Sequence, residues 1–286
     1  MATFTNQATL TYNNTQTLSN ITTGQIVEHL VLEKMSLQQT YAAGDRITYV
    51  VTLVSSGTSD DTGITLTDDL GAGVPPAEKE AVYPLTYDPG SLLVYQNGVP
   101  QTAPQVTSEA PLTVTGIDVT AGGSTVIMYT AQVSGSAPLS VGSVITNTVT
   151  AEGGNLTEPL TDSHTLNVSE APYLTVEKSL TPLTVTANQR VTYTFVINNY
   201  GNTAAEADAN AVITDTLIPV LTGLDVTFNG TAWTENTEYT YSEQTGVFAS
   251  EEGAITVPAA QFTTSPDGTV TSVPGTATLV IEGTIG

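Results

Sequence analysis

The chain has 286 residues, with 28 acidic side chains against five basic ones, a formal net charge of −23 and no cysteine. Its length predicts about two domains. The missing cysteine excludes a disulfide framework and a thiolate metal site, and the acidity argues against nucleic acid and anionic membranes as partners. The chain is 40% hydrophobic and can bury a core. No apolar run approaches the ~18 residues that would predict membrane insertion.

The N-terminal segment, residues 1–28, has the alternation of apolar and polar residues that a half-buried strand has. One face carries Phe4, Asn6, Ala8, Leu10 and Tyr12, whereas threonines and a glutamine take the other. Successive side chains of a strand point to opposite faces, so this segment is expected to bury one face. It lacks the basic and apolar parts of a secretory signal, which leaves the export route open.

Strand-like runs continue along the rest of the chain. Residues 46–54 and 191–197 are β-branched and aromatic, and turn signals such as Asn97-Gly98 separate such runs. No window keeps a helical period with caps, and residues 203–210 are expected to form an acidic loop. Many short strands with regular turns predict an all-β chain of β-sandwiches.

The chain contains two copies of one module. Residues 30–34 (LVLEK) match 174–178 (LTVEK), and residues 66–70 match 213–217 in the same order. Repeats of this kind indicate tandem units. We expect a complete module over residues 29–170 and a second copy over residues 171–286.

The second copy is expected to lack its last strands. The first copy continues into residues 144–151 and a strand near 162–168, which have no counterpart after the second copy. Residues 4–10 (FTNQATL) resemble 145–151 (ITNTVTA), so residues 1–28 are expected to be the missing strands, placed before the first module.

A sandwich without its last strands exposes unpaired backbone and an apolar groove. The first module separates residues 1–28 from the second module of the same chain and leaves almost no linker to fold back. Donation of this segment to the next molecule repeats one junction without closing a ring, which produces a filament. We therefore expect the partner to be a second copy of the chain, assembled head to tail.

Three polar residues of each module fall on apolar strand faces. In the first module they are Lys34, Asp68 and Asn147, and in the second they are Lys178 and Asp215, with Asn6 supplied by a neighbour. Burial lowers the pKa of a lysine and raises that of an aspartate. A neutral amine can attack the asparagine amide while the protonated aspartate polarises its carbonyl and moves protons. The predicted products are isopeptide bonds, Lys34–Asn147 within a chain and Lys178–Asn6 between chains.

Each of these residues also has an ordinary alternative interpretation. A lysine on an early strand can protect a sheet edge, an aspartate can cap a turn, and an asparagine can bond the backbone of a loop. The recurrence of the whole set favours the crosslink. Lys79, the remaining lysine, lies in an acidic loop and is expected to be solvated.

Other chemistry has little support in the sequence. The two histidines, His29 and His164, have no cysteine to accompany them, which disfavours a transition-metal or histidine-based nucleophilic site. The acidic pair Asp60-Asp61 is expected in a solvated loop rather than a calcium site. No cofactor and no metal are expected.

The run LTVEKS … RVTYTFVINNYGN … VITDTL resembles the repeats known as "domain of unknown function eleven", found in bacterial surface proteins, and ITNTVT resembles the ending of that repeat. The resemblance implies immunoglobulin-like sandwiches with a structural or adhesive role outside the cell. Related modules form Lys–Asn bonds assisted by Asp, which maps onto Lys34, Asp68 and Asn147. The chain departs from the pattern at Ser55-Ser56-Gly57, where the family has Asn before Gly.

The sequence therefore predicts a non-enzymatic structural subunit of an extracellular filament, on a cell or spore surface, whose only catalysis is its own crosslinking. The alternative is a monomeric adhesin or stalk module from a longer repeat array.

Overall fold

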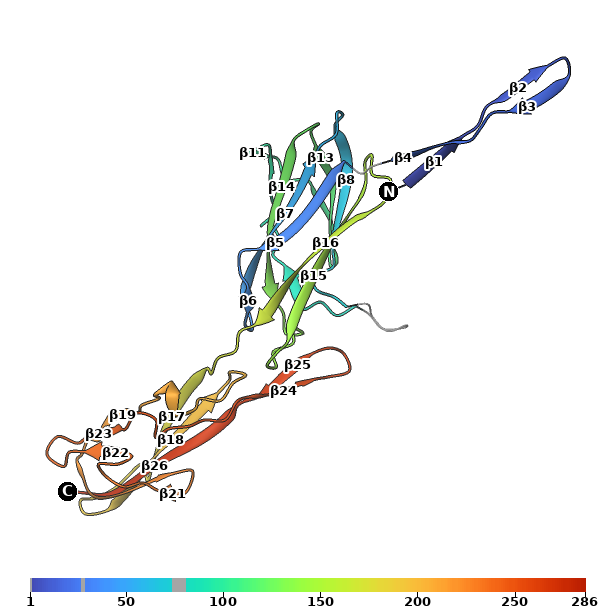
Figure 1. Cartoon of the computed structure of the whole chain (residues 1–286). Coiled ribbons are helices and arrows are strands. Elements are labelled where there is room, and N and C mark those ends of the chain that lie inside the picture. Colours follow the sequence, from blue (N-terminus) through green and yellow to red (C-terminus); the bar gives the residue numbers. More distant parts are fainter. Residues whose placement is uncertain (1, 27–28, 74–80) are drawn as a thin grey trace. The chain divides into compact units, whose positions relative to one another are not determined.

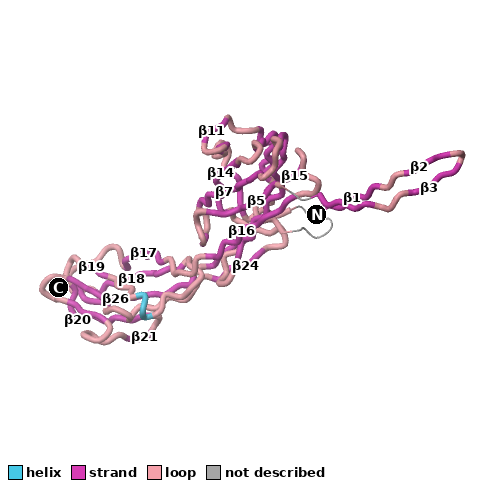
Figure 2. The backbone as a smooth tube through the Cα atoms, turned by 45° about the horizontal axis from the view of Figure 1, so that its top comes forward, coloured by secondary structure: helices cyan, strands magenta, loops and turns pink. Residues whose placement is uncertain are grey.

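A computed structural model describes residues 2–26, 29–73 and 81–286 of the chain (Figure 1). The prediction of an all-β chain is confirmed. The one helical element of the described residues is a 3₁₀ turn, Ala207–Ala209, in a segment expected to be a plain loop (Figure 2). No described helix is long and apolar enough to cross a membrane. Lys79 lies outside the described residues.

The N-terminal segment is an antiparallel hairpin. Two residues with positive φ, Asn13 and Asn14, make its tight turn, as expected of a two-residue hairpin loop. The ladder is interrupted where the backbone N–H of Ala8 donates to Ser19 Oγ at 2.9 Å. Strand β1 (Ala2–Asn6) pairs with β4 (Thr22–Ile26), and β2 (Thr9–Tyr12) pairs with β3 (Thr15–Leu18).

The chain divides into two compact units, Met1–Ala137 with Val144–Asn167, and Pro138–Ser143 with Val168–Gly286. In the first unit two six-stranded sheets enclose the core. One sheet runs β11 (Val99–Gln101), β10 (Leu93–Gln96), β14 (Ser124–Val133), β7 (Arg46–Ser55), β5 (Leu30–Ser36), with β9 (Leu85–Tyr87) also on β14. The other runs β12 (Gln105–Glu109), β13 (Leu112–Val119), β8 (Asp61–Asp68), β15 (Val144–Gly153), β16 (Leu160–Val168), β6 (Thr40–Tyr41).

The second unit has a five-stranded and a three-stranded sheet around its own core, in which Phe195, Phe248 and Leu279 are buried. Strands β24 (Gln261–Thr264) and β25 (Val270–Val273) form a separate hairpin. The larger sheet runs β17 (Leu174–Thr181), β18 (Arg190–Asn199), β26 (Gly275–Ile285), β20 (Leu221–Phe228), β21 (Thr231–Ala232), and the smaller runs β19 (Thr214–Thr216), β23 (Val247–Ser250), β22 (Tyr239–Tyr241).

The two units differ at one sheet edge. In the first unit, β8 pairs with β13 on one side and with β15 on the other. In the second unit, the matching strand β19 pairs with β23 on one side, and no described strand pairs with its other side. The position that β15 fills in the first unit is therefore open in the second.

Candidate functional site

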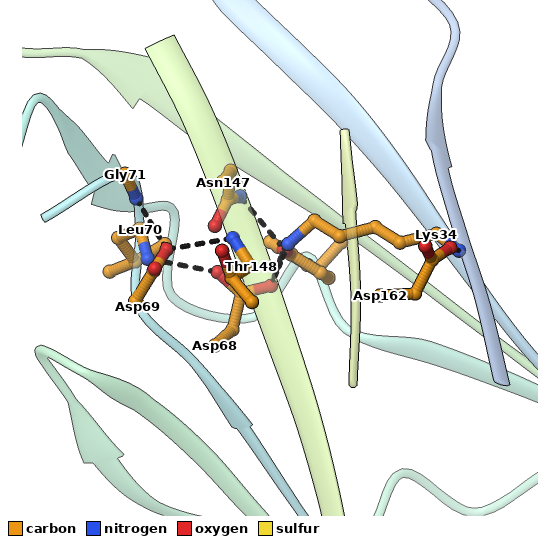
Figure 3. Close-up of polar contacts among 9 residues, drawn as sticks. Lys34, Asp68, Asp69, Leu70, Gly71, Asn147, Thr148 and Asp162 are labelled. Carbon is orange, nitrogen blue, oxygen red and sulfur yellow. Dashed lines mark hydrogen bonds and ion pairs between the residues drawn. The ribbon is translucent and has the colours of Figure 1, made fainter. Parts of the chain in front are cut away.

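Lys34 points into the core of the first unit from strand β5. Buried and exposed residues alternate along this strand, and Lys34 shares the buried face with Leu30 and Leu32. Its side chain is 0% exposed, and its Nζ forms a short contact with Asp68 Oδ2 (Figure 3). The predicted inward orientation of Lys34 is confirmed.

Asp68 ends strand β8 and is held from two sides. Its Oδ1 accepts a hydrogen bond of 3.0 Å from the backbone N–H of Leu70, a residue with positive φ in the turn that follows. Its Oδ2 therefore remains free to meet Lys34, and it also accepts a short hydrogen bond from the hydroxyl of Tyr129.

Asn147 reaches the same place from strand β15 and is fully buried. Its Nδ2 lies 3.4 Å from the Tyr129 hydroxyl, whereas its Oδ1 has no hydrogen-bond partner among the described residues. Asp69 fixes the position of this strand, because its Oδ1 accepts from the backbone N–H of Thr148 at 2.8 Å (Figure 3). The structure thus brings together the three residues predicted for the first crosslink.

Tyr129, on strand β14, is the site residue that sequence reasoning missed. Its hydroxyl donates to Asp68 and lies 3.2 Å from Lys34 Nζ and 3.4 Å from Asn147 Nδ2. The rings of Tyr49 and Tyr129 flank the Lys34 amine, with centroids 4.8 and 5.9 Å away. The cross-strand pair Tyr49–Tyr129 was partly visible in the sequence, because Tyr49 belongs to the repeated RITY and RVTY runs.

Burial controls the protonation of the groups around the amine. Desolvation lowers the pKa of Lys34, although Asp68 opposes this effect, and burial raises the pKa of Tyr129 well above its ordinary value. The site therefore contains an amine biased toward its neutral, nucleophilic form beside a neutral phenol and a carboxyl group. The carbonyl oxygen of Asn147, Oδ1, has no hydrogen-bond partner among the described residues, and the amide carbon that carries it is the electrophile that such an amine can attack.

The second unit repeats half of this site. Lys178 Nζ forms a short contact with Asp215 and lies 4.6 and 5.4 Å from the ring centroids of Tyr193 and Phe195. The side chain of Lys178 is 40% exposed, compared with 0% for Lys34. Lys178 and Asp215 thus meet as predicted, in a site that is open to solvent.

An apolar groove lies beside this open site. Leu174, Val176 and Ile213 line a cavity of about 140 Å³ between β17 and the segment leading into β19. Val176 is 56% exposed, whereas Leu32, which holds the matching position in the first unit, is 8% exposed. In the first unit strand β16 closes over this place, since Asp162 Oδ2 accepts from the backbone N–H of Lys34 at 2.6 Å.

The predicted donor residues are exposed on the N-terminal hairpin. Phe4, Asn6, Ala8, Leu10 and Tyr12 all have exposed side chains. The Phe4 ring lies over Gly24, which is its partner in the β1–β4 ladder. A Cβ atom added at Gly24 would lie 2.3 Å from this ring. The apolar face predicted for this segment therefore has no core around it in the single chain.

One acidic residue lies elsewhere than expected. Asp61 begins strand β8 and is fully buried, where its carboxylate accepts from Ser55 and contacts His29 Nε2 at 2.9 Å. The expectation that Asp61 is solvated in a loop is therefore wrong, because the buried Ser55 and the half-buried His29 supply its polar partners. The described residues contain no group of three or more His, Cys, Asp or Glu placed to hold a metal ion.

No family model and no curated protein matches the chain. Among solved structures, the pilus backbone RrgB of Streptococcus pneumoniae is similar at 13% identity and a TM-score of 0.35, over 90% of this chain and 50% of that one. The major pilin BcpA of Bacillus cereus is similar at 14% identity and 0.36, over 96% and 73%. A family 123 glycoside hydrolase from Clostridium perfringens is similar at 10% identity and 0.31, over 50% and 27%. This chain spans about half the length of RrgB.

Proposed function

We propose that the chain is the structural subunit of an extracellular filament on a cell or spore surface. Subunits assemble head to tail by donor-strand complementation, and autocatalytic Lys–Asn isopeptide bonds join them. The observation that supports this proposal is the contrast between the two units. Strand β15 brings Asn147 to the Lys34–Asp68 pair, whereas the matching Lys178–Asp215 pair is open to solvent and lies beside an apolar groove. The role is structural, because the only reaction is one that the chain performs once on itself.

The N-terminal hairpin of another subunit is the proposed occupant of this groove, because it resembles the strand that fills the matching position in the first unit. Its sequence FTNQATL corresponds to ITNTVTA of β15, and both segments fold as one arm of an antiparallel pair. In the first unit Val149 pairs with Asp68 and Thr150 with Thr67. The same register in the second unit would pair Thr9 of one subunit with Thr214 of the next, and would bring Asn6 to Lys178.

The reaction balances without a co-reactant. Lys34 Nζ attacks Asn147 Cγ and forms the new C–N bond, while the bond from Cγ to Nδ2 breaks and ammonia leaves. One proton passes from the lysine nitrogen to the leaving nitrogen. The same exchange between Lys178 and Asn6 would join two subunits. Each bond survives unfolding, which predicts filaments that resist heat and denaturant.

Denaturing electrophoresis after boiling, with intact mass on the lowest band, tests this function. We expect a ladder of multimers that Asn6→Ala or Lys178→Ala collapses to a monomer lacking one molecule of ammonia. Thr5→Ala, on the opposite face of β1, is the matched control and should keep the ladder. A single band at the unmodified mass, with no filaments in native samples, would contradict the proposal and favour the adhesin or stalk alternative.

A disulfide tests the register independently of the isopeptide bond. The chain has no cysteine, so Thr9→Cys with Thr214→Cys introduces one pair that directly opposed strand positions allow to bridge. In the Lys178→Ala background this pair should form reducible multimers. Thr11→Cys with Thr214→Cys is shifted by two residues and should not, and equal bridging by both pairs would overturn the register.

A further inference from the structure

The first site has four groups, and the hydroxyl of Tyr129 connects the other three, which are the Lys34 amine, the Asp68 carboxyl group and the Asn147 amide. Tyr129 donates to Asp68 Oδ2, and its oxygen lies 3.2 Å from Lys34 Nζ and 3.4 Å from Asn147 Nδ2. Asp68 Oδ2 also contacts the lysine amine. Along these hydrogen bonds, the path from the carboxyl group to the amide nitrogen of Asn147 runs through the phenol.

We propose that Tyr129 is a catalytic residue that passes a proton to the leaving nitrogen of Asn147. This inference rests on the proposed function, and it adds a residue to the Lys, Asp and Asn of the predicted reaction. When Lys34 attacks, its nitrogen must lose one proton, and Nδ2 must gain one to leave as ammonia. Asp68 takes the proton from Lys34, the Tyr129 O–H gives its proton to Nδ2, and Asp68 restores the phenol. The carboxyl group of Asp68 and the phenol of Tyr129 both return to the protonation states that they had before the attack.

The burial of Tyr129 suits this role. The residue is 3% exposed, and burial raises the pKa of its phenol well above the ordinary value, so the hydroxyl keeps its proton until the amine attacks. A proton donor held within hydrogen-bond reach of both reacting nitrogens is the arrangement that general acid catalysis requires. The rings of Tyr49 and Tyr129 flank the amine, and the side chains of Lys34 and Asp68 are 0% and 4% exposed, so bulk water does not compete for the proton.

The second unit has no such phenol at the matching position. Tyr49 pairs with Tyr129 across strands β7 and β14, and the matching Tyr193 pairs with Ile281 across β18 and β26. Ile281 is fully buried and carries no exchangeable proton. The bond within a chain is therefore formed faster than the bond between chains, and a newly docked subunit can still leave before it is joined.

Tyr129→Phe tests the relay, because it keeps the ring and removes only the hydroxyl. The variant is made in the Lys178→Ala background, where only the Lys34–Asn147 bond can form, and loss of ammonia is followed by intact mass during cell-free synthesis. We expect the bond to form about 100-fold more slowly than in the parent, in line with general acid catalysis. Thermal unfolding of Tyr129→Phe and of Asn147→Ala is compared to show that the folded state is retained.

The matched control is Tyr87→Phe, which removes a hydroxyl from the neighbouring ring, 6.3 Å from Tyr129 between centroids, and leaves the four groups of the site in place. It should react at the parental rate. Bond formation in Tyr129→Phe at the parental rate, or equal slowing in Tyr87→Phe, would overturn the relay while leaving the proposed function intact. An unmodified mass in the parent would overturn both the relay and the isopeptide bond of the proposed function.

The order of the two bonds is tested on the unsubstituted chain. At subunit concentrations where the appearance of the ladder no longer depends on concentration, mass loss within the chain should precede the ladder. A ladder that appears as fast as the internal bond would overturn the difference assigned to Ile281.

Discussion

The contact between Lys34 and Asp68 places two ionisable groups where water does not reach either of them. The sequence predicted this pair from alternation alone, because Leu30, Leu32 and Lys34 must share a face once the strand is recognised. It could not identify Tyr129, since the second copy has isoleucine at that position and the repeat gave no signal. The sequence predicted a solvated Asp61 because an acidic pair after a strand is typical of a loop. Its partners Ser55 and His29 lie outside strand β8, so the contacts that bury Asp61 form only in the folded chain.

At the scale of single residues, removing Asp68 leaves a buried amine without its partner. We expect Asp68→Ala to abolish the Lys34–Asn147 bond and to lower the free energy of unfolding by about 3–5 kcal/mol, the usual cost of breaking a buried pair. Intact mass and urea unfolding measure the two effects, with Asn147→Ala as the uncrosslinked reference. Stability equal to that reference would show that Asp68 does not balance the lysine charge.

The pH dependence of the first bond follows from the lowered pKa of Lys34. A free lysine has an ordinary pKa of 10.5, and at pH values below this pKa its neutral fraction rises about tenfold for each pH unit. Because desolvation lowers the pKa of Lys34, its neutral fraction rises with pH and levels off below pH 10.5. The rate of ammonia loss during cell-free synthesis should therefore reach a plateau at a lower pH. A tenfold gain per unit up to pH 10 would contradict this.

At the scale of elements, the matching strands β5 and β17 of the two units have different environments. Residues 30–34 (LVLEK) and 174–178 (LTVEK) share three of five residues, yet β5 is half buried and β17 is mostly exposed. The sequence predicted both strands, and the repeat predicted that the second unit lacks the strand beside β19 that β15 supplies in the first unit. It could not predict the interrupted ladder of the N-terminal hairpin, which depends on hydrogen bonds between residues such as Ala8 and Ser19.

The N-terminal hairpin distributes side-chain volume differently from β15 and β16, the pair of strands that it resembles. In the first unit Ile145 pairs with Leu166, and both are buried. In the hairpin the matching pair is Phe4 with Gly24, one large residue and one without a side chain. The side-chain volume of this pair therefore lies entirely in Phe4. We expect the Phe4 ring to be the main apolar group that enters the groove.

Phe4→Ala should therefore weaken docking more than any other single truncation in the hairpin. Loss of a buried phenylalanine costs about 3–5 kcal/mol, so we expect the ladder to disappear at concentrations where the parent polymerises. Leu18→Ala, at an exposed position of β3, is the control. An undiminished ladder in Phe4→Ala would show that the ring does not enter the groove.

At the scale of the whole molecule, the net charge of −23 should keep the proposed filaments apart from one another. Like charges on separate filaments repel, and salt screens this repulsion over ~8 Å at physiological ionic strength. Negative-stain microscopy should therefore show single filaments at low salt and lateral bundles at high salt. The ladder of covalent multimers should be the same in both. Bundling that does not respond to salt would contradict the electrostatic explanation.

Each chain has an exposed N-terminal hairpin and, elsewhere, an open sheet edge at β19, so the proposed polymer has a direction. One tip displays Phe4 and Asn6, and the opposite tip displays Lys178 beside Asp215. Neither tip can join a tip of its own kind. A host surface or capping protein that recognises one of them would therefore fix which way the fibre points, and a loose copy of the hairpin would halt growth at one tip and leave the other active.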